Sequence, residues 1–560
     1  MSESLGQSGT MLGGGDIDRA WSDAGLRQAS APAHLSDRRL PRSAATQRSA
    51  RPSVLVNGAP LLVVLCALAL RLCLGPLTID DAFITFRYAR NLAEGSGFVY
   101  NLGQHVLGTT TPLYTLLMAA LYRIGVTNLP SAAWILNALL DAGTAWMLYV
   151  IGRRLVDRTA GVAAALLFVC APMGIAFSAG GMEGSLFVFL MVAALLLALN
   201  GRLVASMMLL GLDTLVRPEA ALAAIVVLLV TAVRTKRLPL REGLAYGFTL
   251  APWLAFATWY FGSPIPQSMS AKSTVYSAVY QSEPWINALA LVMQAGLPGQ
   301  SLFLLRAYDN LNAVLLLLVA VALPILVGLA ISGGRRLSRA NPAVIPWVLF
   351  PLLYALAYAA AGARGVRMFH WYIVPLLPFY ALLVATGLRT TTPPAAQPGA
   401  ALRWAPFLLL ALWWAPSLVS PNGIGYPVGF TNGRERLYEE VATDYDARWD
   451  GTTLLALPEI GAIGYHTRAQ VLDTVGLVSP TAVRYYPIPN AQLLADNAVP
   501  SALIRDERPD YVVTLDRFIK GTLTPDAWFF DNYQLVEARE LYDKDVQTLL
   551  VYRRADSPAS

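Results

Sequence analysis

Long apolar segments recur along most of this 560-residue chain, and they restrict its fold more than any other feature. A membrane-spanning helix needs roughly 20 apolar residues, because the hydrocarbon core is about 30 Å thick. Eleven runs approach this length, although several are shorter. They are residues 54–74, 132–151, 160–179, 185–199, 203–215, 220–233, 244–261, 311–331, 344–361, 372–388 and 404–419. The sequence therefore predicts a polytopic all-α membrane domain with about 11 transmembrane helices.

The composition agrees with a membrane protein. Hydrophobic residues make up 55% of the chain and charged residues only 14%, whereas a soluble protein usually carries about 25% charged residues. The net charge of +6 reports topology rather than nucleic-acid binding in such a chain, and no basic run carries interleaved aromatic residues. We therefore expect no nucleic-acid partner. Cys66, Cys73 and Cys170 all fall in apolar runs, so we also expect no disulfide and no thiolate metal site.

Three parts of different composition follow one another along the chain. Residues 1–52 are rich in Ser, Gly, Ala and Arg and cannot bury a core, so we expect a disordered cytoplasmic tail. Residues 53–420 hold the apolar runs and form the predicted transmembrane domain. Residues 421–560 are more polar, with strand patterns at 452–457, 470–473, 511–515 and 546–553 and a helix-like segment at 491–508. Because strands and helices interleave, we predict a C-terminal α/β domain.

The distribution of Lys and Arg predicts the orientation in the membrane. If the N-terminus is cytoplasmic, the inner segments hold the N-terminal arginines and the basic clusters at 153–158, 234–241 and 335–339. The outer segments hold fewer basic residues, which fits the positive-inside rule. This topology predicts a multi-pass protein of the plasma membrane. It places a large first loop, residues 76–125, and the C-terminal domain on the extracytoplasmic side.

The first outer loop carries the adjacent acids Asp80 and Asp81. Their surroundings predict an amphipathic helix over residues 79–93, with Thr78 as its cap and Asp81 completing a capping box. Acids in a first helical turn are also favoured by the helix dipole alone, so a purely structural role stays open. Adjacent residues of a helix point about 100° apart, and the two acids therefore cannot face the same atom equally.

Further polar residues beside apolar runs fall on the same predicted side of the membrane. Charges near membrane segments are costly and usually mark function, and arginine matches phosphate oxygens with its planar fork. Each residue also has a structural interpretation, as a helix cap, an ion pair, an interfacial aromatic or a solvated lysine. The candidates for binding the donor phosphate or substrate are Arg87, Glu183, Arg217, Glu219, Lys272, Arg364, Arg367, His370 and Tyr372.

Several motifs resemble a known family. They are DDAFI at 80–84, GTTTPL at 108–113, GME at 181–183, RPE at 217–219 and GAIGY at 461–465. The pattern departs from the family where Gly184 replaces a Thr and Ala220 replaces a Gly. The chain resembles the membrane-embedded glycosyltransferases of the C superfamily, in particular the actinobacterial arabinofuranosyltransferase-like branch. The likeness covers most of residues 54–520.

The resemblance implies transfer of a sugar, such as arabinofuranose or mannose, from a polyprenyl-phosphate donor. The acceptor would be a cell-envelope glycan, lipid or protein at the outer face of the membrane. The family's base is the acid of the first outer loop, so Asp80 and Asp81 are the catalytic candidates, and Asp80 is our first choice. A carboxylate suits this step because a hydroxyl is a poor nucleophile that needs a base in reach. The two acids could also hold a divalent metal; no other cofactor is implied.

Two other classes of function remain. A transporter or flippase of a lipid-linked saccharide explains the apolar runs, but it leaves the acid pair and the C-terminal domain without a role. A membrane scaffold or sensor with an outer ligand-binding domain leaves the polar cluster unexplained. The sequence determines neither the sugar, the acceptor nor the anomeric outcome.

Overall fold

The computed structural model describes residues 54–277, 312–362, 369–390, 419–420, 423–424, 433–489, 494–542 and 546–556. The predicted tail at 1–52 lies outside the described residues, as does nearly all of the predicted span at 404–419. Arg364 and Arg367 also lie outside them.

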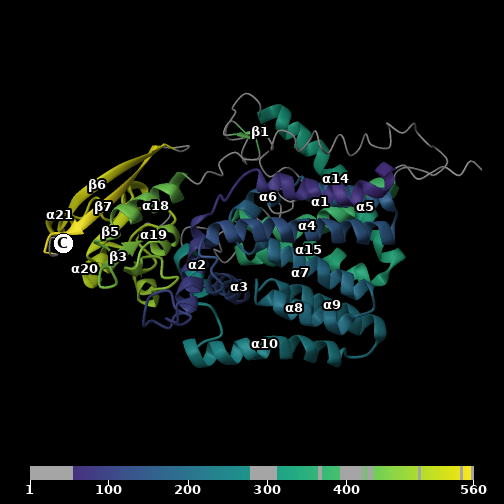
Figure 1. The fold of residues 1–560 in the computed structure, drawn as a ribbon, viewed down its shortest axis with the longest axis horizontal. Coiled ribbons are helices and arrows are strands. Elements are labelled where there is room, and N and C mark those ends of the chain that lie inside the picture. The colour runs from purple at the N-terminus through teal and green to yellow at the C-terminus, as the bar shows by residue number, and fades with distance from the viewer. Residues whose placement is uncertain are drawn as a thin grey trace, which may run out of the picture. The chain divides into compact units, whose positions relative to one another are not determined.

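Helices follow the predicted apolar runs closely. Figure 1 shows α1, α4 and α7 side by side, and α4 packs against both neighbours and against α5. The helices of this part are α1 (Val54–Leu72), α4 (Leu129–Leu155), α5 (Arg158–Val169), α6 (Pro172–Ala179), α7 (Gly184–Leu199), α8 (Leu203–Thr214), α9 (Ala220–Thr235), α10 (Leu240–Phe261), α14 (Asn312–Ala340), α15 (Ile345–Gly362) and α16 (Leu377–Thr390). Two 3₁₀ segments, η1 (Pro342–Val344) and η2 (His370–Leu376), precede α15 and α16.

Three of the described helical segments are long and apolar enough to cross a membrane. They are Leu129–Leu155, Pro342–Gly362 and Trp371–Arg389. The predicted single run at 160–179 is instead two helices, α5 and α6, which meet at a bend of 53° and could together make a fourth span. Pro172 begins the second helix, since proline has no backbone N–H to continue the first. Eleven spans therefore remain a prediction.

The predicted first outer loop, residues 76–125, forms two helices, α2 (Asp80–Ala93) and α3 (Pro112–Arg123). The predicted helix at 79–93 is confirmed to within one residue. The predicted cap is wrong: Ile79 occupies the N-cap position, and no side chain caps the helix. The Thr78 hydroxyl is buried without a hydrogen bond among the described residues. Asp81 lies near Lys272 instead of completing a capping box.

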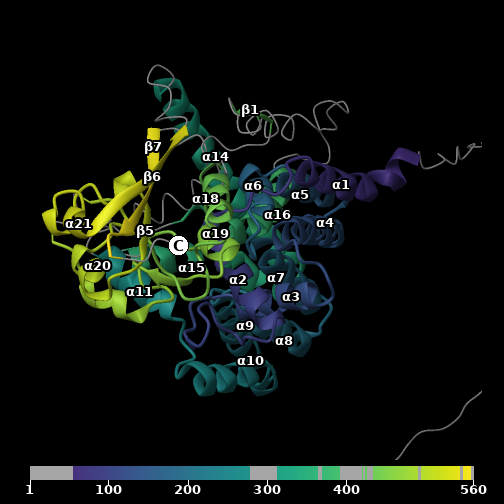
Figure 2. The same ribbon diagram turned by 60° about the vertical axis from the view of Figure 1, so that its left-hand side comes forward.

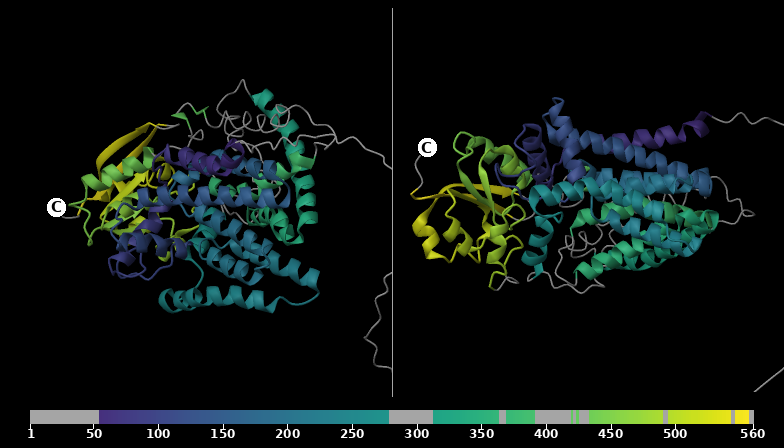
Figure 3. Two further views of the ribbon diagram at one scale, coloured as in Figure 1. Left: turned by 45° about the vertical axis from the view of Figure 1, so that its right-hand side comes forward. Right: turned by 90° about the horizontal axis from the view of Figure 1, so that it is seen from below.

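The C-terminal part contains a five-stranded mixed sheet of order β4-β3-β5-β7-β6. Its strands are β3 (Leu454–Leu457), β4 (Gln470–Asp473), β5 (Tyr511–Leu515), β6 (Tyr533–Tyr542) and β7 (Val546–Arg554). Strands β4, β3 and β5 run parallel, and β7 is antiparallel to β5 and β6. Figure 3 shows β6 and β7 as a long two-stranded ribbon. Sequence patterning missed β6, which is a largely exposed edge strand and lacks a clear apolar alternation.

Helices accompany this sheet. They are α18 (Gly433–Asp444), α19 (Gly461–His466), α20 (Ser501–Glu507) and α21 (Ala527–Asn532), with 3₁₀ segments η3 (Pro480–Tyr485) and η5 (Asp516–Phe518). Helix α11 (Gln267–Ser277) and the short pair β1 (Val419–Ser420) and β2 (Gly423–Ile424) belong to the segments between the apolar helices and the sheet. The predicted helix at 491–508 is shorter than expected, because Pro500 stands at the N-cap of α20. Residues 490–493 lie outside the described residues.

Helix α19 packs directly on α2, as Figure 2 shows. Two glycines make this close approach possible. An added Cβ at Gly461 would lie 2.5 Å from the Asp80 carbonyl carbon, and one at Gly464 would overlap the Tyr100 hydroxyl. The GAIGY motif is therefore a contact surface, through which the C-terminal part holds the helix that carries the two acids.

Candidate functional site

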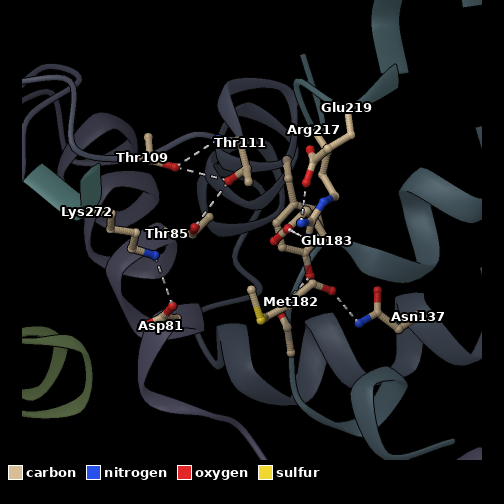
Figure 4. Close-up of polar contacts among 12 residues, drawn as sticks. Asp81, Thr85, Thr109, Thr111, Asn137, Met182, Glu183, Arg217, Glu219 and Lys272 are labelled. Carbon is tan, nitrogen blue, oxygen red and sulfur yellow. Dashed lines mark hydrogen bonds and ion pairs between the residues drawn. The ribbon is translucent and has the colours of Figure 1, made fainter. Parts of the chain in front are cut away.

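A cavity of about 330 Å³ opens between the first outer loop and the ends of several apolar helices. Figure 4 shows many of the polar side chains around it. Asp81, Ile84 and Thr85 come from α2, and the turn at 108–111 adds Gly108 and three threonines. The other lining residues are Met182, Glu183, Arg217, Pro218, Glu219, Ser268, Met269, Lys272, Ser273, Tyr358, Ala361, Trp371, Tyr372 and Leu477.

Asp81 faces this cavity. Its Oδ2 lies 3.8 Å from Nζ of Lys272 on α11, and the two side chains are 32% and 28% exposed. An ion pair this long and this exposed contributes little stability, so both groups can exchange it for a ligand. Thr85 lines the same cavity because residues four apart share one face of a helix. The cavity thus holds a carboxylate and an ammonium group side by side.

Asp80 points toward the C-terminal part instead. Its Oδ2 accepts from the backbone N–H of Gly461 at 2.9 Å, and its Oδ1 accepts from Ala462 at 2.8 Å. The residue is 7% exposed. Burial, with the charge of Glu459 as a smaller contribution, raises the pKa of Asp80 to about 7, although the N–H of Ala462 acts in the opposite direction. The divergence expected of adjacent helical residues thus separates the two acids, one into the cavity and one into the α2–α19 contact.

A buried charge triad lies across the cavity from Asp81. Arg217 donates from Nη1 to Glu183 at 2.9 Å and from Nη2 to Glu219 at 2.7 Å. The Tyr358 hydroxyl donates to the same Glu219 oxygen at 2.6 Å. The Arg217 guanidinium lies 5.4 Å from the centre of the Tyr372 ring. Two carboxylates against one guanidinium give the triad a net negative charge, so Arg217 is poorly placed to bind a phosphate.

Three threonine hydroxyls form a cluster that sequence reasoning did not select as site residues. Thr111 Oγ1 lies 3.0 Å from Thr109 Oγ1 and 3.3 Å from Thr85 Oγ1, and all three residues are mostly buried beside the cavity. Two signals could have found them. Thr85 stands four residues after Asp81, and Thr109 and Thr111 belong to the GTTTPL motif. Hydroxyls can donate to phosphate or sugar oxygens, so these residues extend the candidate site.

The remaining predicted residues have different locations. Arg87 is not among the lining residues; its guanidinium donates to the carbonyl oxygens of Tyr100, Gly464 and Ala469 at 2.8, 2.6 and 2.7 Å. Arg87 therefore fastens the first outer loop to the C-terminal part. The backbone of His370 begins η2, whereas its side chain lies outside the described residues, as do Arg364 and Arg367.

The described residues around the cavity do not fit a divalent metal. Within the described ranges, no three His, Cys, Asp or Glu side chains come together as a metal-binding group. Glu183 and Glu219 are both committed to Arg217, and Asp81 has an ammonium group beside it. A hard cation prefers several oxygen ligands, which these carboxylates cannot offer together.

Solved structures share this arrangement of helices and sheet. ArnT from Cupriavidus metallidurans bound to undecaprenyl phosphate matches with a TM-score of 0.54 and 14% identity, over 90% of this chain and 99% of that one. Oligosaccharyltransferase AglB from Archaeoglobus fulgidus, in complex with an inhibitory peptide and a dolichol-phosphate, gives 0.50 and 15% over 82% and 69%. At these identities the likeness concerns the fold: the chain has the helical fold of the C-superfamily membrane glycosyltransferases, with a small C-terminal sheet domain.

Among curated proteins, the chain is similar to the terminal β-(1→2)-arabinofuranosyltransferase of Mycobacterium tuberculosis. The two are 27% identical over 318 residues, which are 52% of this chain and 46% of that protein. The chain thus spans about half the length of this relative. A family model described as "Domain of unknown function (DUF8728)" matches residues 432–555, nearly the whole sheet domain. The predicted resemblance to C-superfamily glycosyltransferases is confirmed.

Proposed function

We propose that this chain is a glycosyltransferase that moves a sugar from a polyprenyl-phosphate donor to a hydroxyl acceptor at the extracytoplasmic face of the membrane. The observation that carries the proposal is the cavity in which Asp81 lies 3.8 Å from Lys272. The proposed topology keeps eleven spans, a cytoplasmic N-terminus and an extracytoplasmic C-terminal domain. Arabinofuranose is the first sugar to test, because the curated relative is named as an arabinofuranosyltransferase.

The proposed step needs one base and one cation. The Asp81 carboxylate accepts the proton of the acceptor hydroxyl, whose oxygen forms a bond to the anomeric carbon of the donor. The bond between that carbon and the phosphate oxygen breaks, and its electron pair leaves with polyprenyl phosphate. Lys272 stabilises the charge that develops on this leaving group. Threonine hydroxyls beside the cavity supply further hydrogen-bond donors.

The contacts favour Asp81 over Asp80 as the base, which reverses the choice made from the sequence. Both oxygens of Asp80 already accept backbone N–H groups, and the residue is buried against α19. Asp81 is partly exposed and lies on the wall of the cavity. A base must come within hydrogen-bond reach of its substrate, so the greater exposure of Asp81 supports it as the base.

The triad around Arg217 suits the sugar rather than the phosphate. Its net negative charge opposes an anion, whereas carboxylate oxygens accept hydrogen bonds from sugar hydroxyls. In this proposal Glu183 and Glu219 bind sugar hydroxyls, and Arg217 holds the two carboxylates in position. Tyr372 forms part of the adjacent wall. The proposed step is written without a divalent metal, because no three His, Cys, Asp or Glu side chains of the described residues come together as a ligand group.

A transfer assay tests the proposal. Purified protein in nanodiscs receives radiolabelled polyprenyl-phosphate arabinofuranose or another polyprenyl-phosphate sugar, together with saccharide, lipid and peptide acceptors. We expect a new glycosidic product with at least one pair. Asp81→Asn should reduce kcat by roughly 10²–10⁴-fold, as for loss of a positioned base, while Asp80→Asn should affect kcat much less. Movement of the donor across sealed vesicles without a new bond would instead support a transporter, and near-normal turnover by Asp81→Asn would refute its role as base.

A further inference from the structure

The turn between α6 and α7 carries Glu183 to the cavity, and its backbone is held by other parts of the chain. A helix leaves its last four carbonyl groups without partners of its own, and buried carbonyl groups need hydrogen bonds. Each of the five carbonyl oxygens of residues 178–182 accepts a hydrogen bond from outside the turn. Glu183 follows directly, as the N-cap residue of α7. Its position therefore depends on these donors.

Asn137 supplies two of the five hydrogen bonds. It lies fully buried on α4, and its Nδ2 donates to the carbonyl oxygens of Ser178 at 3.1 Å and Met182 at 2.9 Å. Figure 4 shows the second of these bonds close to Glu183. Carbonyl oxygens only accept, so the amide must present its NH₂ group, which has one hydrogen for each of them. Asn137 thus holds the turn at both ends.

The other three hydrogen bonds tie the turn to the first outer loop. The Tyr114 hydroxyl, which is fully buried on α3, donates to the carbonyl oxygen of Gly181 at 3.0 Å. The backbone N–H groups of Leu77 and Ile79 donate to two further oxygens of the turn, at 2.9 and 3.1 Å. These two residues stand immediately before the helix that carries Asp81. The turn therefore connects the proposed base to the carboxylate proposed to bind the sugar.

We propose that Asn137 and Tyr114 are positioning residues for the transfer reaction. They hold the turn so that Glu183 meets the donor sugar at a fixed separation from Asp81. The inference rests on the proposed glycosyltransferase function, in which Glu183 binds sugar hydroxyls. Neither Asn137 nor Tyr114 lines the cavity, so each acts through the turn and not by touching the donor. A misplacement of about 1 Å can cost ~10²-fold in rate, so loss of these bonds should be felt in the reaction.

Two variants remove the donors with little change of shape. Asn137→Leu replaces the amide by a branched apolar side chain of similar size, and Tyr114→Phe removes only the hydroxyl, which is the milder change. Thr144→Val is the matched control, because Thr144 is also fully buried on α4 and its hydroxyl donates to Leu140 of the same helix at 2.9 Å. Glu183→Ala, alone and combined with Asn137→Leu, tests whether Asn137 acts through Glu183.

Kinetic constants are measured for the full-length protein in nanodiscs, with a donor and acceptor pair that gives product in the transfer assay. Asn137→Leu should raise the donor KM by ~10–10²-fold, as for loss of a hydrogen bond to a carboxylate, while the acceptor KM changes less than about twofold. Tyr114→Phe should raise the donor KM several-fold, and Thr144→Val should leave both constants unchanged. A general loss of folded protein would lower the apparent kcat alone. In the double variant the loss of kcat/KM should be smaller than the product of the single losses.

Three results would overturn the positioning role. They are a donor KM in Asn137→Leu and Tyr114→Phe that matches Thr144→Val, an equal rise in the acceptor KM, and fully multiplicative losses in the double variant. The glycosyltransferase function would stand in each case, because the wild type still transfers sugar. Absence of transfer by the wild type from every donor would instead refute the glycosyltransferase function itself.

Discussion

Gly461 is the position at which a single methyl group should separate the C-terminal domain from the helix that carries Asp81. An added Cβ would lie 2.5 Å from the carbonyl carbon of Asp80 and 2.8 Å from its Cγ, whereas ordinary contacts begin near 3.4 Å. The first obstacle is backbone, which cannot rotate away as a flexible side chain can. Because the carbonyl oxygen of Asp80 would lie closer still, α19 and α2 must move apart in Gly461→Ala by more than about 0.9 Å, the difference between 3.4 and 2.5 Å.

The magnitude follows from the contacts that this shift would break. The two N–H groups that bond the Asp80 carboxylate, at 2.9 and 2.8 Å, would lie roughly 3.7 Å away, which is outside hydrogen-bond range. Overpacking typically costs about 1–3 kcal/mol, and an unsatisfied buried N–H costs a similar amount. We expect the α2–α19 contact to weaken by at least ~1–3 kcal/mol, which corresponds to a ~5–150-fold larger opening equilibrium.

Hydrogen exchange measured by mass spectrometry can detect this change in peptides that cover residues 458–473. In Gly461→Ala the amides of these peptides should exchange ~5–150-fold faster than in the wild type. Sugar transfer should also slow, because a misplacement of about 1 Å can cost ~10²-fold in rate. Gly451→Ala is the control, because its added Cβ would meet no atom within 4 Å. Wild-type protection and turnover in Gly461→Ala would refute the close-packing account of the GAIGY motif.

Three further outcomes are expected. Burial raises the pKa of Asp80 from 3.8 to about 7, so its contribution to stability is complete below pH ~4 and is lost as the pH rises through about 7. Thermal unfolding should show that the free energy of unfolding decreases by up to ~4 kcal/mol over this range. The decrease should be smaller in Asp80→Asn, and an equal pH dependence in that variant would contradict this prediction. Arg217→Gln leaves the buried carboxylates of Glu183 and Glu219 without their cation and should lower the free energy of unfolding by ~3–5 kcal/mol, against ~0.5–1.5 kcal/mol for the control Tyr358→Phe. Equal melting temperatures of the two variants would count against the triad. Thr85→Val removes a hydroxyl at nearly constant volume and should raise the donor KM several-fold with little change in melting temperature, whereas an unchanged donor KM would remove Thr85 from the donor site.

Local sequence patterns determined the helices and most strands, because these depend on neighbouring residues. The apolar runs located the boundaries of α7 and α8 to within one residue at each end, and β4 and β5 matched their predicted bounds. Local patterns did not predict a helix break at proline or an exposed edge strand. Pro172 divides one predicted span, and β6 has no clear apolar period because much of it is exposed. The helical rotation between adjacent residues was also enough to predict that Asp80 and Asp81 diverge.

Only the tertiary structure decided which direction each acid takes. The partners of Asp80 are backbone N–H groups 381 and 382 residues away in the chain, so no local pattern could identify them. Arg87 likewise bonds a carbonyl oxygen 377 residues away. The sequence predicted Arg217 as a candidate site residue. Its hydrogen bonds to Glu183 and Glu219 depend on the packing of separate helices, which the sequence did not show. Helical and strand periodicity arise within a segment, whereas the partners of a buried charge are set by which distant segments meet.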